Sequence, residues 1–586
     1  MILQQLTRYY ETMLERGEIS SPGWDDNVKV TFGLELAEDG RLLQLLPLKT
    51  QQQRGKKLVE VPRGMRVPAR AKKTSGVAAN FLCDTAVYML GIDTKGKPER
   101  TRSCFEANRA LHREILAEVD SPAARAILAF FETWEQESAA EHPCLTDTLK
   151  ELMGGVNLIF CHEMQPVTED PAIRSAWQRH YSAADEDAKV AQCLVTGQMA
   201  PVARLHPNIK GVRGAQATGA SLVSFNAPAF ESYGQTQGDN APVGRYAAFA
   251  YTTALNALLA SNTCRVIGDT TVVCWAECGE PAYQQFGMSA LFDQPEQFEE
   301  QDLYDVLDKL AKGAPCDWDG FELDPEEHFY ILGLAPNAGR LSVRFFLRDS
   351  FGRFMQNLKQ HYRDIAVVHN PDDHFAELPI WKLLGETVNQ NSRSKDPQPQ
   401  LAGDMLRAVL MGSPYPATLL NGAQLRIRAE HEVTRGRAAI IKGYYTRLLR
   451  AGRSADTYPK EDVLQMELNE HSMNLPYTLG RLFSLYEQIQ EAANPGINAT
   501  IKDKYFNSAS CTPATIFPLL GNLAEKHLRV IRRSKPGLAV TLEKRLGEMA
   551  VRIGEGYPVR LSLPEQGSFQ LGYYFEKQAR YQKKEQ

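Results

Sequence analysis

Residues 328–349 read HFYILGLAPNAGRLSVRFFLRD, two apolar runs separated by the turn residues 336–339. Apolar runs of this length, joined by Pro, Asn and Gly, predict a β-hairpin. Upstream, VKVTFGLEL (28–36) and RLLQLLPLK (41–49) flank the turn signal AEDG and predict a second hairpin. Downstream of residue 400, apolar residues recur at spacings of three and four, which predicts helices. The sequence therefore predicts an α+β fold, a mixed α/β N-terminal region followed by an all-α helical bundle.

Changes in this pattern divide the chain into five segments. They are a mixed α/β domain (1–290), an acidic segment with the hairpin and a helix (291–388), a polar linker (389–400), a basic helical segment (401–465) and a helical bundle (466–586). Further strands are predicted at 188–197 and 270–277, and helices at 79–90, several places up to about 182, 438–450, 475–494 and 511–533.

Composition excludes several classes of protein. The chain has no run of eighteen apolar residues, so no membrane span and no membrane partner are expected. The first eighteen residues lack the basic-then-apolar layout of a secretion signal. The ten cysteines are scattered singly, which fits a reducing compartment better than a disulfide framework. The sequence predicts a soluble, cytoplasmic protein.

The formal net charge of −5 averages over strongly charged segments. Residues 49–73 carry nine cations and one acid, and residues 407–453 carry nine cations and two acids. Residues 292–330 carry thirteen acids and two lysines, a hypothetical partner-docking or strand-excluding surface. Because charges farther apart than about 8–10 Å are screened at physiological salt, the local blocks decide what each surface attracts. The basic blocks predict phosphate binding, and the first, rich in Pro and Gly, is expected to be an exposed loop.

Several fragments resemble catalytic motifs, and each fails a physical requirement. The phosphate-loop spacing of 91–97 is followed by Pro98, where magnesium binding needs Ser or Thr. Cys161-His162 and Cys274-x-x-x-Cys278 have no second pair at zinc spacing. The cluster 369–374 (HNPDDH) could hold a metal, but a solvated loop is the more common role of such a segment. We therefore expect no catalytic residues, no metal, no cofactor and no enzymatic activity.

The segment 70–80 (RAKKTSGVAAN) combines the residue types that contact DNA. Lysine and hydroxyl side chains suit phosphates, and a carboxamide suits a base edge. Ser75 or Asn80 would equally well cap the following helix. The predicted duplex-binding residues here are Lys72, Lys73, Thr74, Ser75 and Asn80, with phosphate contacts from Arg54, Lys56, Lys57, Arg66 and Arg70.

A second candidate is the glycine-rich, basic stretch 206–221, followed by the polar loop 222–244. Glycine lets a backbone lie close to a sugar-phosphate chain. We expect phosphate contacts from Lys210 and Arg213, and duplex contacts from Asn226, Gln235 and Gln237. Exposed polar loops of this kind are more often without a binding role.

The helical region offers a third candidate, a surface for single-stranded nucleic acid. Cations three and four residues apart share one helix face. The predicted strand-binding residues are Arg437, Lys442, Lys526, Arg529, Arg532 and Arg533. Residues 573–575 (YYF) lie beside Lys577 and could stack on bases, although aromatics at helical spacing more often belong to a core.

Long strings of this sequence closely resemble the large subunit of the type I-C CRISPR Cascade complex. They occur in the same order in that family and reach from the N-terminal third to the last residues. They are 72–91 (KKTSGVAANFLCDTAVYMLG), 203–243 (from ARLHPNIKGVRG to QTQGDNAPV), 247–259 (AAFAYTTALNALL), 267–277 (IGDTTVVCWAE), 332–346 (LGLAPNAGRLSVRFF) and 563–578 (LPEQGSFQLGYYFEKQ).

The resemblance implies a non-catalytic, nucleic-acid-binding role. Such subunits recognise the protospacer-adjacent motif in double-stranded DNA, promote R-loop formation, hold the displaced strand and support recruitment of a helicase-nuclease. The implied partners are CRISPR RNA, target double-stranded DNA, the Cascade backbone and foot subunits, a small subunit and the helicase-nuclease. The family also implies that the C-terminal helical region resembles the small subunit, with Met466 or Met473 as candidate internal starts.

Two alternatives stay open at the level of sequence. The chain could be a CRISPR repeat RNA-processing endonuclease with a metal-independent site, or a purely structural scaffold that binds guide RNA. The first predicts cleavage of a repeat RNA by the isolated protein. The second predicts that changes in the proposed DNA-binding residues leave target affinity unchanged.

Overall fold

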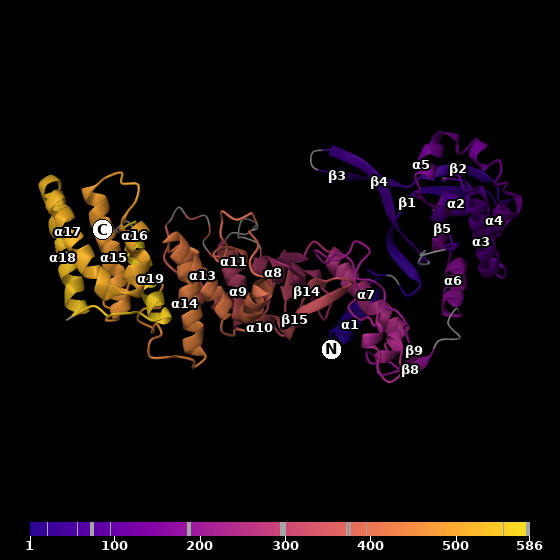
Figure 1. Cartoon of the computed structure of the whole chain (residues 1–586). Helices are drawn as coiled ribbons and strands as arrows, with labels where there is room; N and C mark the ends of the chain where they lie inside the picture. The colour runs from indigo at the N-terminus through magenta and orange to yellow at the C-terminus, as the bar shows by residue number, and fades with distance from the viewer. Residues whose placement is uncertain are drawn as a thin grey trace. The chain divides into compact units, whose positions relative to one another are not determined.

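The computed structural model describes residues 1–19, 21–54, 57–70, 76–93, 95–183, 189–292, 300–370, 373, 375, 377–393, 395–554 and 556–581 (Figure 1). Two compact units account for the chain. The first contains residues 3–207 and 224–254, and the second contains residues 208–223 and 255–586. The chain passes from one unit to the other more than once, so each unit is assembled from segments that are distant in sequence.

The first unit is built on a sheet with the strand order β3-β4-β1-β6-β5, with β2 on β1 and β7 on β6. The strands are β1 (Trp24–Leu36), β2 (Leu42–Pro47), β3 (Lys49–Arg54), β4 (Lys57–Pro68), β5 (Cys83–Thr85), β6 (Asn157–His162) and β7 (Gln165–Pro166). β1 runs parallel to β6 and antiparallel to β2 and β4. Both faces of β6 are buried, since Leu158 and Phe160 join one cluster and Ile159 and Cys161 another.

Helices make up much of the rest of the first unit, and the first of them, α1, packs its Tyr10 ring edge-on against Phe249. They are α1 (Ile2–Glu15), α2 (Ala86–Met89), α3 (Pro98–Leu116), α4 (Pro122–Thr133), α5 (Leu149–Met153) and α6 (Pro171–Ala183), and a hairpin of β8 (Val190–Gln192) and β9 (Met199–Pro201) follows them. α4 shows the local logic: the Ser121 side chain accepts a hydrogen bond from the Ala124 N–H, and Pro122 takes the first helical position. Its buried face then packs Ile127 and Phe130 into the core.

The predicted hairpins at 28–49 and 328–349 are confirmed, but two other local expectations are wrong. The basic block is not a loop: β3 pairs residue for residue with the first half of β4, and the hairpin projects beyond the helices of its unit (Figure 1). Pro68 ends β4, where no further ladder N–H is needed. The helix expected at 79–90 covers only 86–89, because residues 83–85 pair with β6 instead.

The second unit contains an antiparallel sheet in the order β10-β11-β14-β15 and a separate two-stranded sheet. The strands are β10 (Arg265–Ile267), β11 (Thr270–Ala276), β14 (His328–Asn337) and β15 (Arg340–Ser350), with β12 (Cys316–Trp318) and β13 (Phe321–Leu323) forming the smaller sheet. Every residue of β11 is buried, which explains why its sequence is apolar without alternation.

Helices make up the rest of this unit, as predicted for the residues after the linker. They are α8 (Pro281–Phe292), α9 (Glu300–Ala311), α10 (Phe351–Ile365), α11 (Ile380–Gly385), α12 (Leu401–Leu410), α13 (Ala417–Glu430), α14 (Arg435–Arg450), α15 (Leu475–Ala493), α16 (Ile501–Cys511), α17 (Pro513–Ser534), α18 (Pro536–Ile553) and α19 (Leu563–Gln578), and α7 (Arg245–Ala260) has residues in both units.

One hydrophobic core runs from the sheet of the second unit through its helices, from Ile267 to Phe575. The closest helix packing is between α15 and α19, where a Cβ on Gly480 would lie 1.9 Å from the Phe569 carbonyl oxygen. A Cβ on Gly572 would lie 2.1 Å from the Tyr477 carbonyl oxygen. Glycine at both positions therefore lets the two helix backbones touch.

The structure also bears on two predictions from composition, one about membrane-spanning helices and one about disulfide bonds. Among the described residues, no helix is both long enough and apolar enough to cross a membrane. All ten cysteines are described, and each is a free thiol.

Candidate nucleic-acid interface

Residues 208–221 of the second unit form a loop whose backbone is held on several sides. Ile209 and Ala220 exchange both backbone hydrogen bonds at 2.9 Å, which closes the loop at its base. The Lys210 N–H donates to the Asn256 side chain on α7 at 2.8 Å, and the Arg213 N–H donates to the Thr271 hydroxyl on β11 at 3.1 Å. The loop is thus fixed by its main chain, which leaves its side chains available for other contacts.

Glycines allow the loop to follow this path. Gly211, Gly214 and Gly219 have φ angles of +92°, +78° and +94°, a region that side chains disfavour. A Cβ on Gly219 would also lie 2.8 Å from the Asn208 Cβ. The glycines of the sequence pattern are therefore required by the conformation of the loop.

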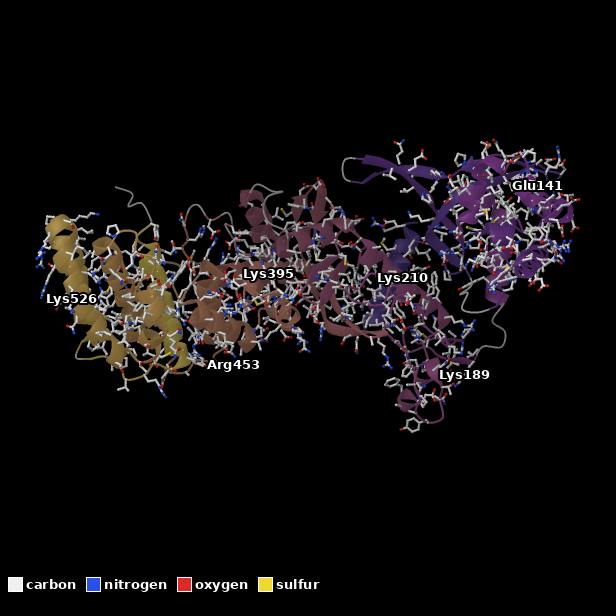
Figure 2. The ribbon with its side chains drawn as sticks, turned by 45° about the horizontal axis from the view of Figure 1, so that its top comes forward. Glu141, Lys189, Lys210, Lys395, Arg453 and Lys526 are labelled. Atoms are coloured by element: carbon white, nitrogen blue, oxygen red, sulfur yellow. The ribbon has the colours of Figure 1, made fainter. Side chains whose placement is uncertain are left out.

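The two cations predicted on this loop are exposed. Lys210 and Arg213 project into solvent, and neither has an ion-pair partner among the described residues (Figure 2 labels Lys210). Gln216 and Thr218 are exposed beside them. Unpaired cations and polar side chains on a fixed glycine-rich backbone are suited to contacts with phosphates.

The polar loop of the first unit is organised around Asn240. Its side-chain oxygen accepts from the Ser232 N–H at 2.8 Å, and its amide nitrogen donates to the carbonyls of Gln235 and Gln237 at 3.0 Å each. Tyr233 stands at the tip, fully exposed, with a φ angle of +53°. The loop therefore has a defined shape rather than an extended one.

Both predicted glutamines of this loop are held by cations. Lys189 donates to the Gln235 side-chain oxygen at 2.7 Å, and Arg204 donates to that of Gln237 at 3.0 Å. The side-chain amide N–H groups of both glutamines have no hydrogen bond among the described residues. Such donors match the acceptors that A·T pairs present in the minor groove. Asn226, predicted with them, is also exposed.

The basic hairpin β3–β4 is partly neutralised by its own neighbours. Arg66 pairs with Asp26 at 2.9 Å and Arg70 pairs with Asp25 at 3.2 Å, so two predicted phosphate ligands already have a carboxylate. Arg63 is exposed and has no ion pair in the described part of the chain. Lys56 and the side chains of Arg54 and Lys57 lie outside the described residues.

The predicted duplex-binding segment 70–80 is described only in part. Lys72, Lys73, Thr74 and Ser75 lie outside the described residues. Asn80 is buried, and its backbone N–H donates to the Asp84 carboxylate at 3.0 Å. A side chain in that position is not presented to a base edge in this structure.

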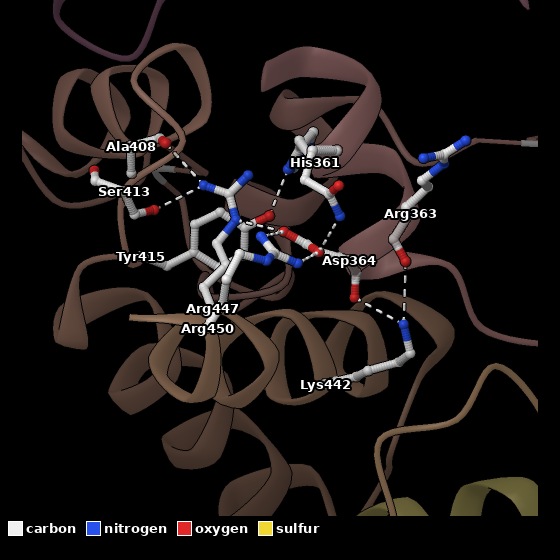
Figure 3. A network of polar contacts seen from close by, with 10 residues as sticks. His361, Arg363, Asp364, Ala408, Ser413, Tyr415, Lys442, Arg447 and Arg450 are labelled. Atoms are coloured by element: carbon white, nitrogen blue, oxygen red, sulfur yellow. Dashed lines mark hydrogen bonds and ion pairs between the residues drawn. The ribbon is translucent and has the colours of Figure 1, made fainter. Parts of the chain in front are cut away.

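Two of the predicted strand-binding cations are buried in ion-pair and hydrogen-bond networks. Lys442 donates to the carbonyl of Asp364 at 2.9 Å (Figure 3), and burial lowers its pKa to about 8. Arg437 is 3% exposed and pairs with Glu386 and Glu430. The charged groups of Lys442 and Arg437 are already bonded within the second unit, so neither is available to a nucleic-acid strand.

The Asp364 carboxylate neutralises two arginines of the second basic block, residues 407–453. It pairs with Arg447 at 2.8 Å and also with Arg450 (Figure 3). The Arg447 guanidinium lies 4.2 Å from the centroid of the Tyr415 ring and donates to two carbonyl oxygens. Arg447 and Arg450 therefore support the fold, whereas Arg407 and Arg453 of the same stretch are exposed and have no ion pair among the described residues.

The remaining predicted cations lie on one helix. Lys526, Arg529 and Arg533 of α17 are exposed and have no ion pair among the described residues (Figure 2 labels Lys526). Arg532 differs, because it pairs with Glu543 on α18. α17 thus presents three unpaired cations at the spacing of one helix face. Tyr573 and Phe575, by contrast, are core residues.

The fragments that resembled catalytic motifs form no metal site in the described part of the chain, where no three His, Cys, Asp or Glu side chains are grouped. Asp372 and His374 lie outside the described residues. Cys274 is buried, and burial raises the pKa of its thiol. The expected absence of catalysis stays a prediction.

Sequence reasoning missed the residues that position others. Lys189 and Arg204 hold the glutamines from outside their loop, and Asn256 and Thr271 hold the backbone of the glycine-rich loop. No sequence motif marks these four residues as partners. Each lies far along the chain from the residue that it contacts, and only folding brings the two together.

Comparison with known protein families identifies a match over nearly the whole chain. A family model described as CRISPR-associated protein (Cas_Csd1) matches residues 6–581, nearly the whole chain. A search of curated proteins finds no match.

Proposed function

Because the chain belongs to the Cas_Csd1 family of CRISPR-associated proteins, a Cascade large-subunit family, we propose that it recognises a protospacer-adjacent motif in duplex DNA. In this proposal it is the large subunit of a cytoplasmic type I-C complex and promotes R-loop formation. It holds the displaced strand and supports recruitment of a helicase-nuclease. Its partners are CRISPR RNA, target DNA, the backbone and foot subunits and a small subunit.

The glycine-rich loop is the observation that carries this proposal. Its backbone is fixed by α7 and β11, while Lys210 and Arg213 point into solvent without a carboxylate. Because its backbone is already fixed, the loop loses little main-chain entropy when its cations meet a phosphate. We propose that this loop fixes the register of the protein on duplex DNA.

The loop around Asn240 supports the sequence-reading part of the proposal. Gln235 and Gln237 present amide N–H donors whose orientation is set by Lys189 and Arg204. Donors of fixed direction can distinguish base edges, whereas mobile ones lose selectivity. The unplaced residues 72–75 stay a sequence prediction of further duplex contacts.

The test is a double variant, Lys210→Ala with Arg213→Ala, in the assembled complex. Loss of two phosphate contacts is expected to weaken binding to motif-bearing duplex and to lower the slope of log affinity against log salt by about 2. Fluorescence anisotropy over a salt series measures both. Assembly of the complex, followed by size-exclusion chromatography, is expected to be unchanged.

Arg41 and Arg125 provide the matched control. Both are exposed, but each already pairs with an aspartate, Asp39 at 2.7 Å and Asp120 at 2.7 Å. Their double alanine variant is expected to bind duplex DNA normally. Equal binding by the Lys210/Arg213 variant and this control would instead favour a purely structural guide-RNA scaffold.

We also propose that the chain does no covalent chemistry. The alternative, an endonuclease that processes CRISPR repeat RNA, predicts product bands when the isolated protein is incubated with that RNA. We expect intact RNA in this assay, with and without divalent metal.

A further inference from the structure

A cavity of about 510 Å³ lies in the second unit, and none of its lining residues belongs to the glycine-rich loop. Its walls come from the β10–β11 turn, α11, the residues that follow α11, and the junction of α13 with α14. Its volume is within the range of about 300–1,000 Å³ that ligand pockets occupy. The side chains at its rim and floor indicate what it binds.

Trp381 of α11 lines this cavity and is 46% exposed. Phe375 supports it edge-on, with ring centroids 5.9 Å apart and an angle of 71° between the rings. A tryptophan that is held in place yet still open to solvent offers a flat π surface. Every nucleobase can stack on such a surface.

Cations stand beside the indole. Lys382 and Lys395 line the same cavity, and neither has an ion-pair partner among the described residues (Figure 2 labels Lys395). Gln390 donates to the Gly385 carbonyl at 3.0 Å, which leaves its amide oxygen able to accept from a base. The rim therefore combines a stacking surface, two phosphate-binding groups and one base-edge acceptor.

The acids in the cavity are already neutralised. Glu386 accepts from the Thr434 hydroxyl at 2.8 Å and pairs with Arg437 at 3.3 Å. Glu430 pairs with Arg437 and with Arg426, the latter at 3.2 Å. With Glu386 and Glu430 compensated, Lys382 and Lys395 give the cavity a positive field that attracts an anion.

We propose that this cavity binds one nucleotide of a single-stranded nucleic acid, with its base on Trp381 and its phosphates at Lys382 and Lys395. An acidic peptide would satisfy the lysines but would leave the indole face without a flat partner. The inference rests on the strand-holding part of the proposed function and deepens it, because a single strand here would be held independently of its sequence.

The test uses the full chain and a four-residue oligothymidylate carrying 4-thiothymidine for photo-crosslinking. The crosslinked peptide, identified by mass spectrometry, is expected to contain Trp381. In anisotropy titrations, Trp381→Ala is expected to raise the dissociation constant about five- to tenfold, as loss of one stacking contact does. Trp381→Phe keeps an aromatic surface and is expected to lose much less.

Leu425→Ala is the matched control, since Leu425 is also an exposed apolar side chain of this unit and does not line the cavity. It is expected to bind the oligonucleotide like the unaltered chain. A crosslink that misses the Trp381 peptide, or unchanged affinity in Trp381→Ala, would overturn the proposal. Protection of Trp381 by a hexaglutamate peptide but not by the oligonucleotide would make the cavity a protein-docking site instead.

The outcome is separable from that of the proposed function. The Lys210/Arg213 double variant is expected to keep the Trp381 crosslink, because its substitutions lie outside the cavity. Loss of duplex binding in that variant and loss of the crosslink in Trp381→Ala are therefore independent results.

Discussion

At the scale of single residues, the role of a cation depends on whether it is buried in an ion pair or exposed without one. Arg447 and Lys210 are both basic residues in segments that the sequence marks as nucleic-acid binding. Arg447 is 1% exposed and bound to Asp364, whereas Lys210 is exposed and unpaired. The first contributes to stability, and the second is available to a ligand.

The substitution Asp364→Asn is expected to destabilise the second unit by about 3–5 kcal/mol, because it leaves Arg447 buried without its counter-charge. Urea unfolding followed by circular dichroism measures this. Glu543→Gln is the control, since its pair with Arg532 is at the surface and is worth at most about 1 kcal/mol. Equal effects of the two changes would contradict a structural role for Asp364.

His112 predicts a pH dependence of the first unit. Its Nε2 accepts from the Leu82 N–H at 3.0 Å, and burial lowers its pKa to about 4. The unfolded chain takes up this proton near pH 6.5, but the folded chain does so only near pH 4. Stability is therefore complete above pH 6.5 and falls as pH drops towards 4, by about 2 kcal/mol at pH 5.

Unfolding in urea at pH 7 and pH 5 tests this linkage. His112→Gln removes the titrating group and is expected to reduce the loss between the two pH values. Burial also lowers the pKa of His206 to about 4, so part of the loss is expected to persist. The same pH dependence in His112→Gln and in the unaltered chain would rule out the assignment.

At the scale of elements, a loop can be rigid without regular secondary structure. The glycine-rich loop has its main-chain groups bound to α7, β11 and the turn between β14 and β15, where the Ser221 N–H donates to the Gly339 carbonyl at 3.1 Å. Three independent attachments fix its path. The conformation of the loop therefore depends on α7, β11 and the turn between β14 and β15.

Gly219→Ala is expected to weaken duplex binding while changing the stability of the second unit little. Alanine is disfavoured at a φ of +94°, and its Cβ would lie 2.8 Å from the Asn208 Cβ, so the loop must shift. Anisotropy and urea unfolding measure the two effects. Gly339→Ala, where a Cβ meets nothing within 4 Å, is expected to be neutral in both.

At the scale of the whole molecule, an acidic net charge coexists with locally basic surfaces. The formal charge of −5 would repel DNA if it were spread evenly. Exposed cations without an ion pair among the described residues include Lys210 and Arg213 on the glycine-rich loop, and Lys526, Arg529 and Arg533 on α17. Screening over about 8–10 Å lets such surfaces act independently of distant acids.

We therefore expect the affinity for DNA to fall steeply with salt despite the acidic total. Replacing Lys526, Arg529 and Arg533 by alanine is expected to reduce the salt slope for complexes that contain a displaced strand, without changing which motif is preferred. Filter binding at several salt concentrations tests this. Arg532→Ala, whose side chain is already paired, serves as the control, and an altered motif preference would contradict the assignment.

Much of the fold follows from local sequence. The apolar runs and turn chemistry of 328–349 predict β14 and β15, and apolar spacings of three and four predict α14, α15 and α17. The basic block at 49–73 shows the limit, because its prolines and cations predict a loop, whereas residues 49–54 pair with 57–62 as a hairpin and residues 63–68 pair with β1.

The sequence by itself determined the family, the α+β class and the glycine-rich basic loop, because these depend on residue order and local conformation. Only the tertiary structure decided which cations remain free. Asp364 reaches Arg447 across 83 residues of chain, and Lys189 reaches Gln235 across 46. A charge is neutralised by whatever lies within a few ångströms of it, and that neighbour is chosen by packing rather than by position in the sequence.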